Sequence, residues 1–253
     1  MPYRRLPNTD SARIRSLQSI VKQGGMLPIN SIAISHPLLL KITSFLPLFK
    51  QNVDYQNESF RRQSQNSKTY LEVQKRAKLY ISHYIQVVNL AIIRGELKPE
   101  IRKYYGLEED QKTVPALNTE SDIITWGERI IKGESERLLT GASPITNPTI
   151  AVVKVRYEDF TRTFRNQKNL QEIFAKACTK VATLRQEADE LILEAWNQIE
   201  QHFSNLPQEE MRKNAALYGV TYVYRKNEKD NEDDDNNLNQ NDLEPKSDLF
   251  NSI

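Results

Sequence analysis

The amino-acid sequence predicts an all-α protein, an elongated antiparallel helical bundle built from two pseudo-repeated units with long helices. Two observations support this fold class. Residues 55–93 align without a gap with residues 155–193, and the segments 48–94 and 149–206 contain neither glycine nor proline. In both segments apolar residues recur at spacings of three and four, which is the period of an amphipathic helix. Duplicated helical segments bury their apolar stripes against one another, so the two long helices are expected to pack together.

The repeat has an offset of 100 residues and is visible in both identities and apolar positions. Nine residues of the first segment recur in the second: Glu58, Phe60, Arg62, Asn66, Lys68, Glu72, Ala77, Gln86 and Ile92. The apolar stripe recurs as well, with Tyr70, Val73, Ala77, Ile81, Tyr84, Val88 and Ala91 matched by Leu170, Ile173, Ala177, Val181, Leu184, Ala188 and Leu191. The first repeat therefore covers about residues 1–105, and the second about residues 111–206.

The first helix is expected to begin at Asn8 or Thr9. Either side chain can accept a hydrogen bond from the free amides of a first helical turn. The paired glycines Gly24-Gly25 are expected to end this helix. A similar opening, Asn118-Thr119-Glu120-Ser121, predicts the start of a second short helix.

The first long helix is expected to follow an N-cap at Ser35, with Pro47 kinking or dividing it. Two interpretations of the long segments remain open. Each is one continuous helix, or each folds into a hairpin at the polar clusters 63–68 and 165–169. No glycine or proline marks those clusters, which favours continuous helices, because polar residues weaken a helix pair locally without breaking it.

The C-terminal part of the folded region predicts shorter elements. Residues 99–105 are expected to form a short helix and residues 207–217 a last helix. The alternation in Val220–Tyr224 is typical of a strand. A lone strand needs a partner, and both Ile29–Ile34 and Pro2–Leu6 are candidates.

The charge is unevenly distributed along the chain. Residues 1–110 carry 17 Lys/Arg and 9 Asp/Glu, a net charge of +8, whereas residues 227–253 carry 2 and 9, a net charge of −7. The last segment is too polar to offset its loss of chain entropy by burial. We therefore expect residues 1–226 to form a single helical domain, with 207–226 as its C-terminal helix and strand, and 227–253 to be a disordered acidic tail.

No catalytic, cofactor-binding or metal-ligating group is recognisable in the sequence. None of the three histidines has a glutamate three residues before it, so the metal pairs of di-iron bundles are missing. Gly127 and Gly133 resemble a phosphate loop only superficially, because glutamate follows where that motif needs lysine. Cys178 is the only cysteine, which predicts a cytoplasmic protein. No apolar run approaches the length of about 20 residues that spans a bilayer. We expect neither an enzyme nor a membrane protein.

A basic set on the first repeat is the one candidate binding surface. The candidate nucleic-acid contacts are Arg61, Arg62, Lys68, Lys75, Arg76 and Lys78. Tyrosines interleave with these cations, and such a mixture can neutralise phosphates and stack on bases. The alternative interpretation of the same pattern is that the cations form an ordinary solvent-exposed face and that the tyrosines are buried in the core.

Four stretches carry a resemblance to a known family. They are MPYRRLPNTD at the start, LYISHYIQVVNLAIIRGEL at 79–97, NPTIAVVKV at 147–155 and LYGVTYVYR at 217–225. With these the chain resembles an uncharacterised family of helical proteins from Bacteroidetes over residues 1–226. The resemblance implies the same segmentation and a bacterial cytoplasmic setting, but no activity, cofactor or catalytic residue.

Two functions follow as expectations. The first is a non-enzymatic interaction or scaffold protein that presents long helical surfaces to a protein partner, or to a second copy of itself. The alternative is a nucleic-acid-binding protein that uses the basic first repeat, with the acidic tail as a competitor for the same cations.

Overall fold

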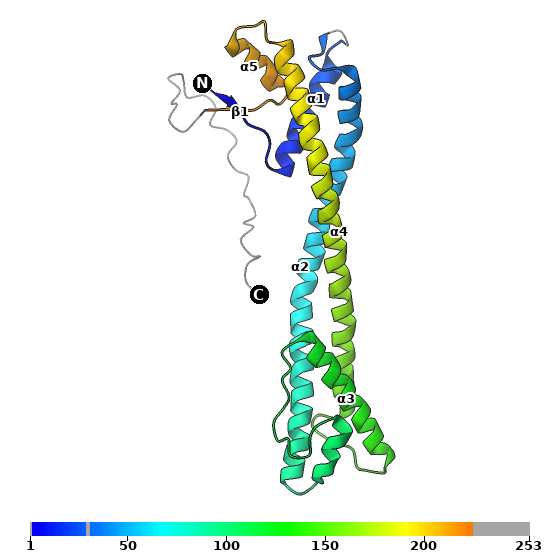
Figure 1. Cartoon of the computed structure of the whole chain (residues 1–253). Coiled ribbons are helices and arrows are strands. Elements are labelled where there is room, and N and C mark those ends of the chain that lie inside the picture. Colours follow the sequence, from blue (N-terminus) through cyan, green and yellow to red (C-terminus); the bar gives the residue numbers. More distant parts are fainter. Residues whose placement is uncertain (1, 29–30, 225–253) are drawn as a thin grey trace. The chain divides into compact units, whose positions relative to one another are not determined.

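A computed structural model of the chain describes residues 2–28 and 31–224, and these residues form an all-α fold (Figure 1), as the sequence predicts. Apart from its helices the described chain has only two short strands, β1 (Tyr3–Arg4) and β2 (Tyr222–Val223). The helices are α1 (Asp10–Met26), α2 (His36–Ile93), the 3-10 helix η2 (Pro99–Tyr105), α3 (Glu120–Leu139), α4 (Ile150–His202) and α5 (Gln208–Leu217). The disorder predicted for 227–253 concerns residues outside the described chain.

The chain forms two compact units. Unit 1 contains the described residues of 1–43 and of 189–253, and unit 2 is Ser44–Ala188. This division differs from the two predicted sequence repeats, because each unit includes parts of both α2 and α4.

The predicted helix starts at Thr9 and Thr119 are confirmed. The Thr9 hydroxyl accepts a hydrogen bond from the amide of Ala12 at 3.2 Å. Thr119 and Asp122 form a capping box, in which each side chain accepts a hydrogen bond from the other residue's backbone amide. Because these caps depend on residues within one turn, they could be read from the sequence.

The predicted end of α1 at Gly24-Gly25 is wrong, since the helix continues to Met26. Gly24 packs against α2. A Cβ atom added there would lie 2.7 Å from a methyl group of Leu39, closer than packed carbon atoms approach. The glycine at this position therefore permits close packing of two helices instead of ending one.

The long segments form continuous helices, and the hairpin alternative is wrong. Pro47 lies inside α2 without dividing it. The polar clusters meet each other in unit 2. Asn66 Nδ2 donates to Gln167 Oε1 at 2.6 Å, and Asn166 Nδ2 donates to Asn66 Oδ1 at 2.8 Å. Polar residues can interrupt the apolar stripe here because they satisfy one another's hydrogen bonds across the helix pair.

Within unit 2, α2 and α4 lie side by side in antiparallel orientation (Figure 1). Residue numbers on α4 fall as those on α2 rise, and the contacting pairs are Gln56 with Cys178, Phe60 with Phe174, Tyr70 with Phe164, and Tyr80 with Arg156. The stripe positions Ala77, Ile81 and Val181 are fully buried, at 0% exposure. The two helices pack together in unit 2 as predicted, but the antiparallel register places the stripe around Tyr70 beside Phe164, so this stripe does not face its own repeat at 170–191.

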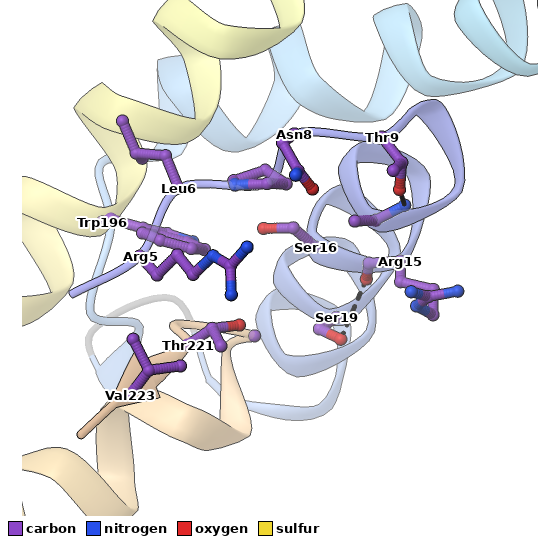
Figure 2. Close-up of a pocket in the computed structure, with 13 residues that line it drawn as sticks. Arg5, Leu6, Asn8, Thr9, Arg15, Ser16, Ser19, Trp196, Thr221 and Val223 are labelled. Carbon is purple, nitrogen blue, oxygen red and sulfur yellow. Dashed lines mark hydrogen bonds between the residues drawn. The ribbon is translucent and has the colours of Figure 1, made fainter. Parts of the chain in front are cut away.

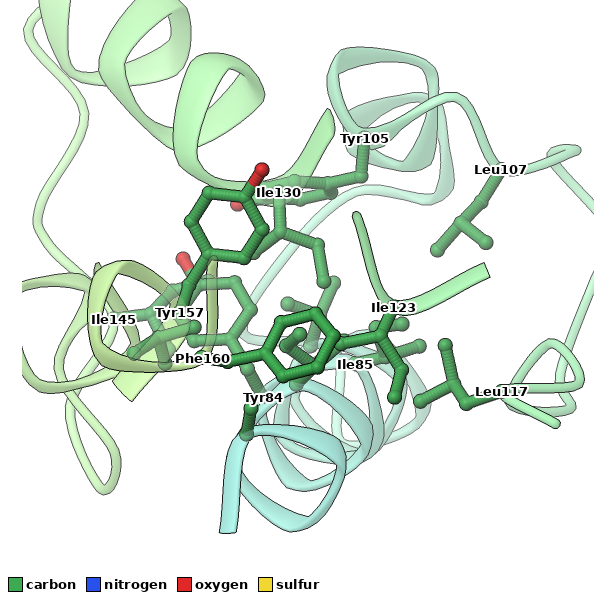
Figure 3. Packing of buried hydrophobic residues seen from close by; sticks show 14 of the residues in the cluster. Tyr84, Ile85, Tyr105, Leu107, Leu117, Ile123, Ile130, Ile145, Tyr157 and Phe160 are labelled. Atoms are coloured by element: carbon green, nitrogen blue, oxygen red, sulfur yellow. The ribbon is translucent and has the colours of Figure 1, made fainter. Parts of the chain in front are cut away.

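The core of unit 2 is completed by α3 and η2 (Figure 3). Two glycines of α3 allow its close approach: an added Cβ would lie 2.3 Å from the Tyr157 ring at Gly127, and 2.2 Å from the Tyr104 carbonyl oxygen at Gly133. The glycines that superficially resemble a phosphate loop are thus packing residues. The buried residues labelled in Figure 3 are Tyr84, Ile85, Tyr105, Leu107, Leu117, Ile123, Ile130, Ile145, Tyr157 and Phe160.

In unit 1 the extended N-terminal segment pairs with the strand that follows α5. β1 and β2 are antiparallel, with Tyr3 opposite Val223, and the Arg5 amide donates to the Thr221 carbonyl oxygen at 2.9 Å. Of the two candidate partners of the C-terminal strand, the N-terminal segment is therefore the correct one.

Candidate functional site

All six predicted nucleic-acid contacts lie on α2 in unit 2, and all six are exposed. Arg61, Lys68 and Lys75 follow one another at intervals of seven residues, which is two helical turns. Arg62 and Arg76 form a neighbouring row. Together with Lys78 these side chains occupy one broad side of the helix.

Two features of this side reduce its suitability for nucleic acid. Glu58 forms ion pairs with both Arg61 and Arg62, the second at 2.9 Å. The hydrogen bond from Arg62, and then that from Arg61, lowers the pKa of Glu58, so this carboxylate stays charged among the cations. Tyr70 and Tyr84 are buried, at 7% and 0% exposure, and cannot stack on bases.

A second row, which has three apolar and two polar members, lies on α2 opposite its core stripe. We define the outer row as Leu79, His83, Gln86, Leu90 and Ile93, all of which are exposed. Its members are spaced by four, three, four and three residues, the spacing of a helix–helix seam. The core stripe 77, 81, 84, 88 and 91 has the same spacing, and each of its positions precedes the corresponding position of the outer row by two residues. Because two residues rotate the helix by about 200°, the two rows face opposite ways.

The apolar members of the outer row are strongly exposed. Leu79 is 61% exposed, Leu90 is 50% exposed and Ile93 is 65% exposed. Single exposed apolar side chains are common on protein surfaces, but a regularly spaced row is a feature of helix–helix interfaces. This row was not predicted from the sequence, because only the core stripe was assigned there. The second set of three-and-four spacings in 79–93 was the available signal.

Unit 2 also contains a buried ionic cluster of Glu134, Arg137 and Tyr105. Arg137 donates to both carboxylate oxygens of Glu134 at 2.8 Å, and the Tyr105 hydroxyl donates to Glu134 Oε2 at 2.6 Å. The Ile145 amide also donates to Glu134, and Arg137 donates to the Ser143 carbonyl oxygen. The cluster therefore connects α3 with η2 and with the loop before α4.

Burial and hydrogen bonding oppose each other in this cluster. Burial alone raises the pKa of Glu134, but the hydrogen bonds from Arg137, Tyr105 and Ile145 outweigh it and lower the pKa below the ordinary value. The hydrogen bond to Glu134 raises the pKa of Arg137. Both groups are charged at neutral pH and neither is poised to transfer a proton, so the cluster has the character of a structural ion pair.

This cluster was not predicted from the sequence either. Ile123, Ile130, Glu134 and Arg137 continue one row of α3 at spacings of seven, four and three, so two charged residues stand where the apolar row predicts buried ones. A carboxylate and a guanidinium in such positions indicate a paired, buried bridge.

The remaining features concern metal binding, membrane insertion and similarity to known proteins. No group of three or more His, Cys, Asp or Glu side chains that could hold a metal ion occurs in 2–28 and 31–224. None of the helices in this part of the chain is long and apolar enough to cross a membrane. Comparison with family models, curated proteins and solved structures found no match for the chain. The family resemblance drawn from the sequence stays a prediction.

Proposed function

We propose that this protein is a non-enzymatic interaction or scaffold protein, which uses the outer row of α2 to bind a helix of a protein partner. The exposure of Leu79, Leu90 and Ile93, which lie on one row of α2 at 50–65% exposure, carries the proposal. Covering a Leu or Ile side chain completely contributes about 1.5–3 kcal/mol, so three such residues supply a useful binding energy. An amphipathic partner helix would present matching residues at the same three-and-four spacing. The lone Cys178 supports a cytoplasmic setting.

Site-specific photo-crosslinking tests this proposal. A photo-reactive residue at Leu90 is expected to give a crosslinked product of defined mass in the native cell, because Leu90 lies within the outer row, between Leu79 and Ile93. The same residue at Lys180, an exposed position of α4, serves as the matched control and is expected to give only background. The product's mass distinguishes a second copy of the chain from another protein.

The double variant Leu79→Ser/Ile93→Ser completes the experiment. Both positions are exposed, so the helical circular dichroism should not change, while the Leu90 crosslink should fall by at least about tenfold. Equal crosslinking from Leu90 and Lys180, or a Leu90 product that is insensitive to the double variant, would show that the outer row is ordinary surface.

A second candidate function, nucleic-acid binding, is favoured by the six exposed cations on one side of α2. Their charge is partly compensated by Glu58, and the nearby tyrosines of the core are unavailable for stacking. The distribution of charge and aromatic residues thus gives this candidate less support than the outer row gives to protein binding. Its affinity would come mainly from phosphate neutralisation and would fall steeply with salt.

Removal of residues 227–253 distinguishes between protein binding and nucleic-acid binding as the function. That segment has a net charge of −7 and, if the cations bind nucleic acid, should compete for them. For a scaffold protein we expect the shortened chain to show only weak, salt-sensitive association with single-stranded RNA, measured by fluorescence anisotropy at physiological ionic strength. Micromolar or tighter binding that is lost in Arg61→Ala/Arg62→Ala/Lys75→Ala/Arg76→Ala would favour the second candidate instead.

A further inference from the structure

Unit 1 contains a pocket of about 440 Å³ that the outer row does not involve. Three segments form its walls: the extended residues 5–9, one face of α1, and residues 219–223 after α5 (Figure 2). Trp196 of α4 closes one side. A volume of this size is in the range of small-molecule sites.

Backbone contacts bring the three segments together. The hydrogen bond from the Arg5 amide to Thr221 holds the first segment beside the last. Gly219 has a φ of +85° and packs directly on α1, where an added Cβ would lie 2.9 Å from Ser19 Cβ and 3.3 Å from Ser16 Cα. Only glycine fits this position, and it places Thr221 next to the small face of α1 formed by Ala12, Ser16 and Ser19.

The pocket collects hydrogen-bond donors and a cation. Figure 2 shows the Ser16 hydroxyl pointing into the same space as the Arg5 guanidinium, with Thr221 on the other side of Arg5. Ser16 is 5% exposed, and its hydroxyl has no hydrogen-bond partner in the described chain. Trp196 is 1% exposed, and its Nε1 is likewise unpartnered there. Buried polar groups are normally paired, so the Ser16 hydroxyl, which points into the pocket, indicates a site that a ligand completes.

The lining defines the charge of that ligand. Arg5 and Arg15 are among the lining residues, and none of these residues carries a carboxylate. The Arg5 side chain forms no ion pair with another described residue, and a guanidinium is a strong hydrogen-bond donor to anions. Leu6, Trp196 and Val223 add an apolar wall beside the donors.

We infer that this pocket binds the phosphate group of a small phosphate monoester that has an apolar body. Arg5, Ser16 and Thr221 approach from three different chain segments, which suits the three peripheral oxygens of a tetrahedral phosphate better than the two coplanar oxygens of a carboxylate. The guanidinium provides charge-assisted hydrogen bonds to the phosphate oxygens. The apolar body of the ligand lies against Trp196 and Leu6.

Calorimetric titration of the full chain with phenyl phosphate tests the inference, with benzoate and inorganic phosphate as comparison probes. Phenyl phosphate is expected to bind saturably and at least about tenfold more tightly than benzoate. Inorganic phosphate should compete with it for the same site. Arg5→Ala is expected to weaken phenyl phosphate binding at least about tenfold, because it removes a charge-assisted contact. Arg76→Ala, on α2 in unit 2, is the matched control and should leave the affinity unchanged.

Ser16→Ala provides an independent readout. It removes a buried hydroxyl that lacks a protein partner, so the ligand-free variant should melt at the same or a higher temperature, while the rise in melting temperature caused by phenyl phosphate should shrink. A purely structural role for Ser16 predicts the reverse, a less stable protein with unchanged ligand response. The inference is overturned by that result, by absence of saturable binding, by equal affinities for phenyl phosphate and benzoate, or by equal effects of Arg5→Ala and Arg76→Ala. All these outcomes are independent of the outer row.

Discussion

Replacing Ile81 or Val181 by aspartate is expected to lower the free energy of unfolding by several kcal/mol. Both side chains are fully buried in unit 2, at 0% exposure, one on α2 and one on α4. An aspartate at either position would be buried, and burial of an unpaired charge is costly. This loss is a large part of the 5–15 kcal/mol that stabilises a typical domain. Urea denaturation followed by far-ultraviolet circular dichroism measures it.

Leu79→Asp is the matched control for Ile81→Asp. It introduces the same carboxylate two residues away on α2, but at a side chain that is 61% exposed. Its effect on the free energy of unfolding should stay within about 1 kcal/mol. If Ile81→Asp and Leu79→Asp unfold at the same urea concentration, the assignment of core stripe and outer row to opposite sides of the helix is wrong.

Replacing Glu134 by alanine is expected to destabilise the protein by about 3–5 kcal/mol, because it leaves the Arg137 guanidinium buried without its carboxylate. The substitution also removes the acceptor of the hydrogen bonds from Tyr105 and Ile145. Replacing both residues, as Glu134→Leu/Arg137→Met, should recover much of the loss, since no unpaired charge remains. Glu172→Ala, which breaks an exposed ion pair with Lys176, should leave the free energy of unfolding nearly unchanged.

The pH dependence of stability checks the same cluster. An unfolded glutamate has a pKa of about 4.3, and the hydrogen bonds of the folded state lower the pKa of Glu134 below its ordinary value despite its burial. The stabilisation is therefore fully present above about pH 4.3 and is lost as the pH falls through the lower, folded value. Glu134→Gln should lose less stability than the parent over this acid range. An identical acid profile for parent and variant would mean that Glu134 is not held as a charged partner of Arg137.

Local features of the protein could be predicted from the sequence because they depend on residues within one or two helical turns. The caps at Thr9 and Thr119 and the three-and-four apolar spacing of the long segments are of this kind. The all-α class follows from the spacing alone. The absence of glycine and proline from 48–94 likewise favoured the continuous course of α2 over a hairpin, although both remained open until the partner helix was known.

Only the tertiary structure decided which surfaces meet. In the folded chain the polar residues around Asn66 form hydrogen bonds with residues of α4. Gly24 lies where α1 contacts α2 and does not end the helix. The tertiary structure also separates the buried stripe of α2 from the outer row, although both rows have the same spacing in the sequence. The pocket around Ser16 joins segments more than 200 residues apart in the chain. Spacing along a helix defines its faces, but burial depends on the surfaces that distant segments bring against them.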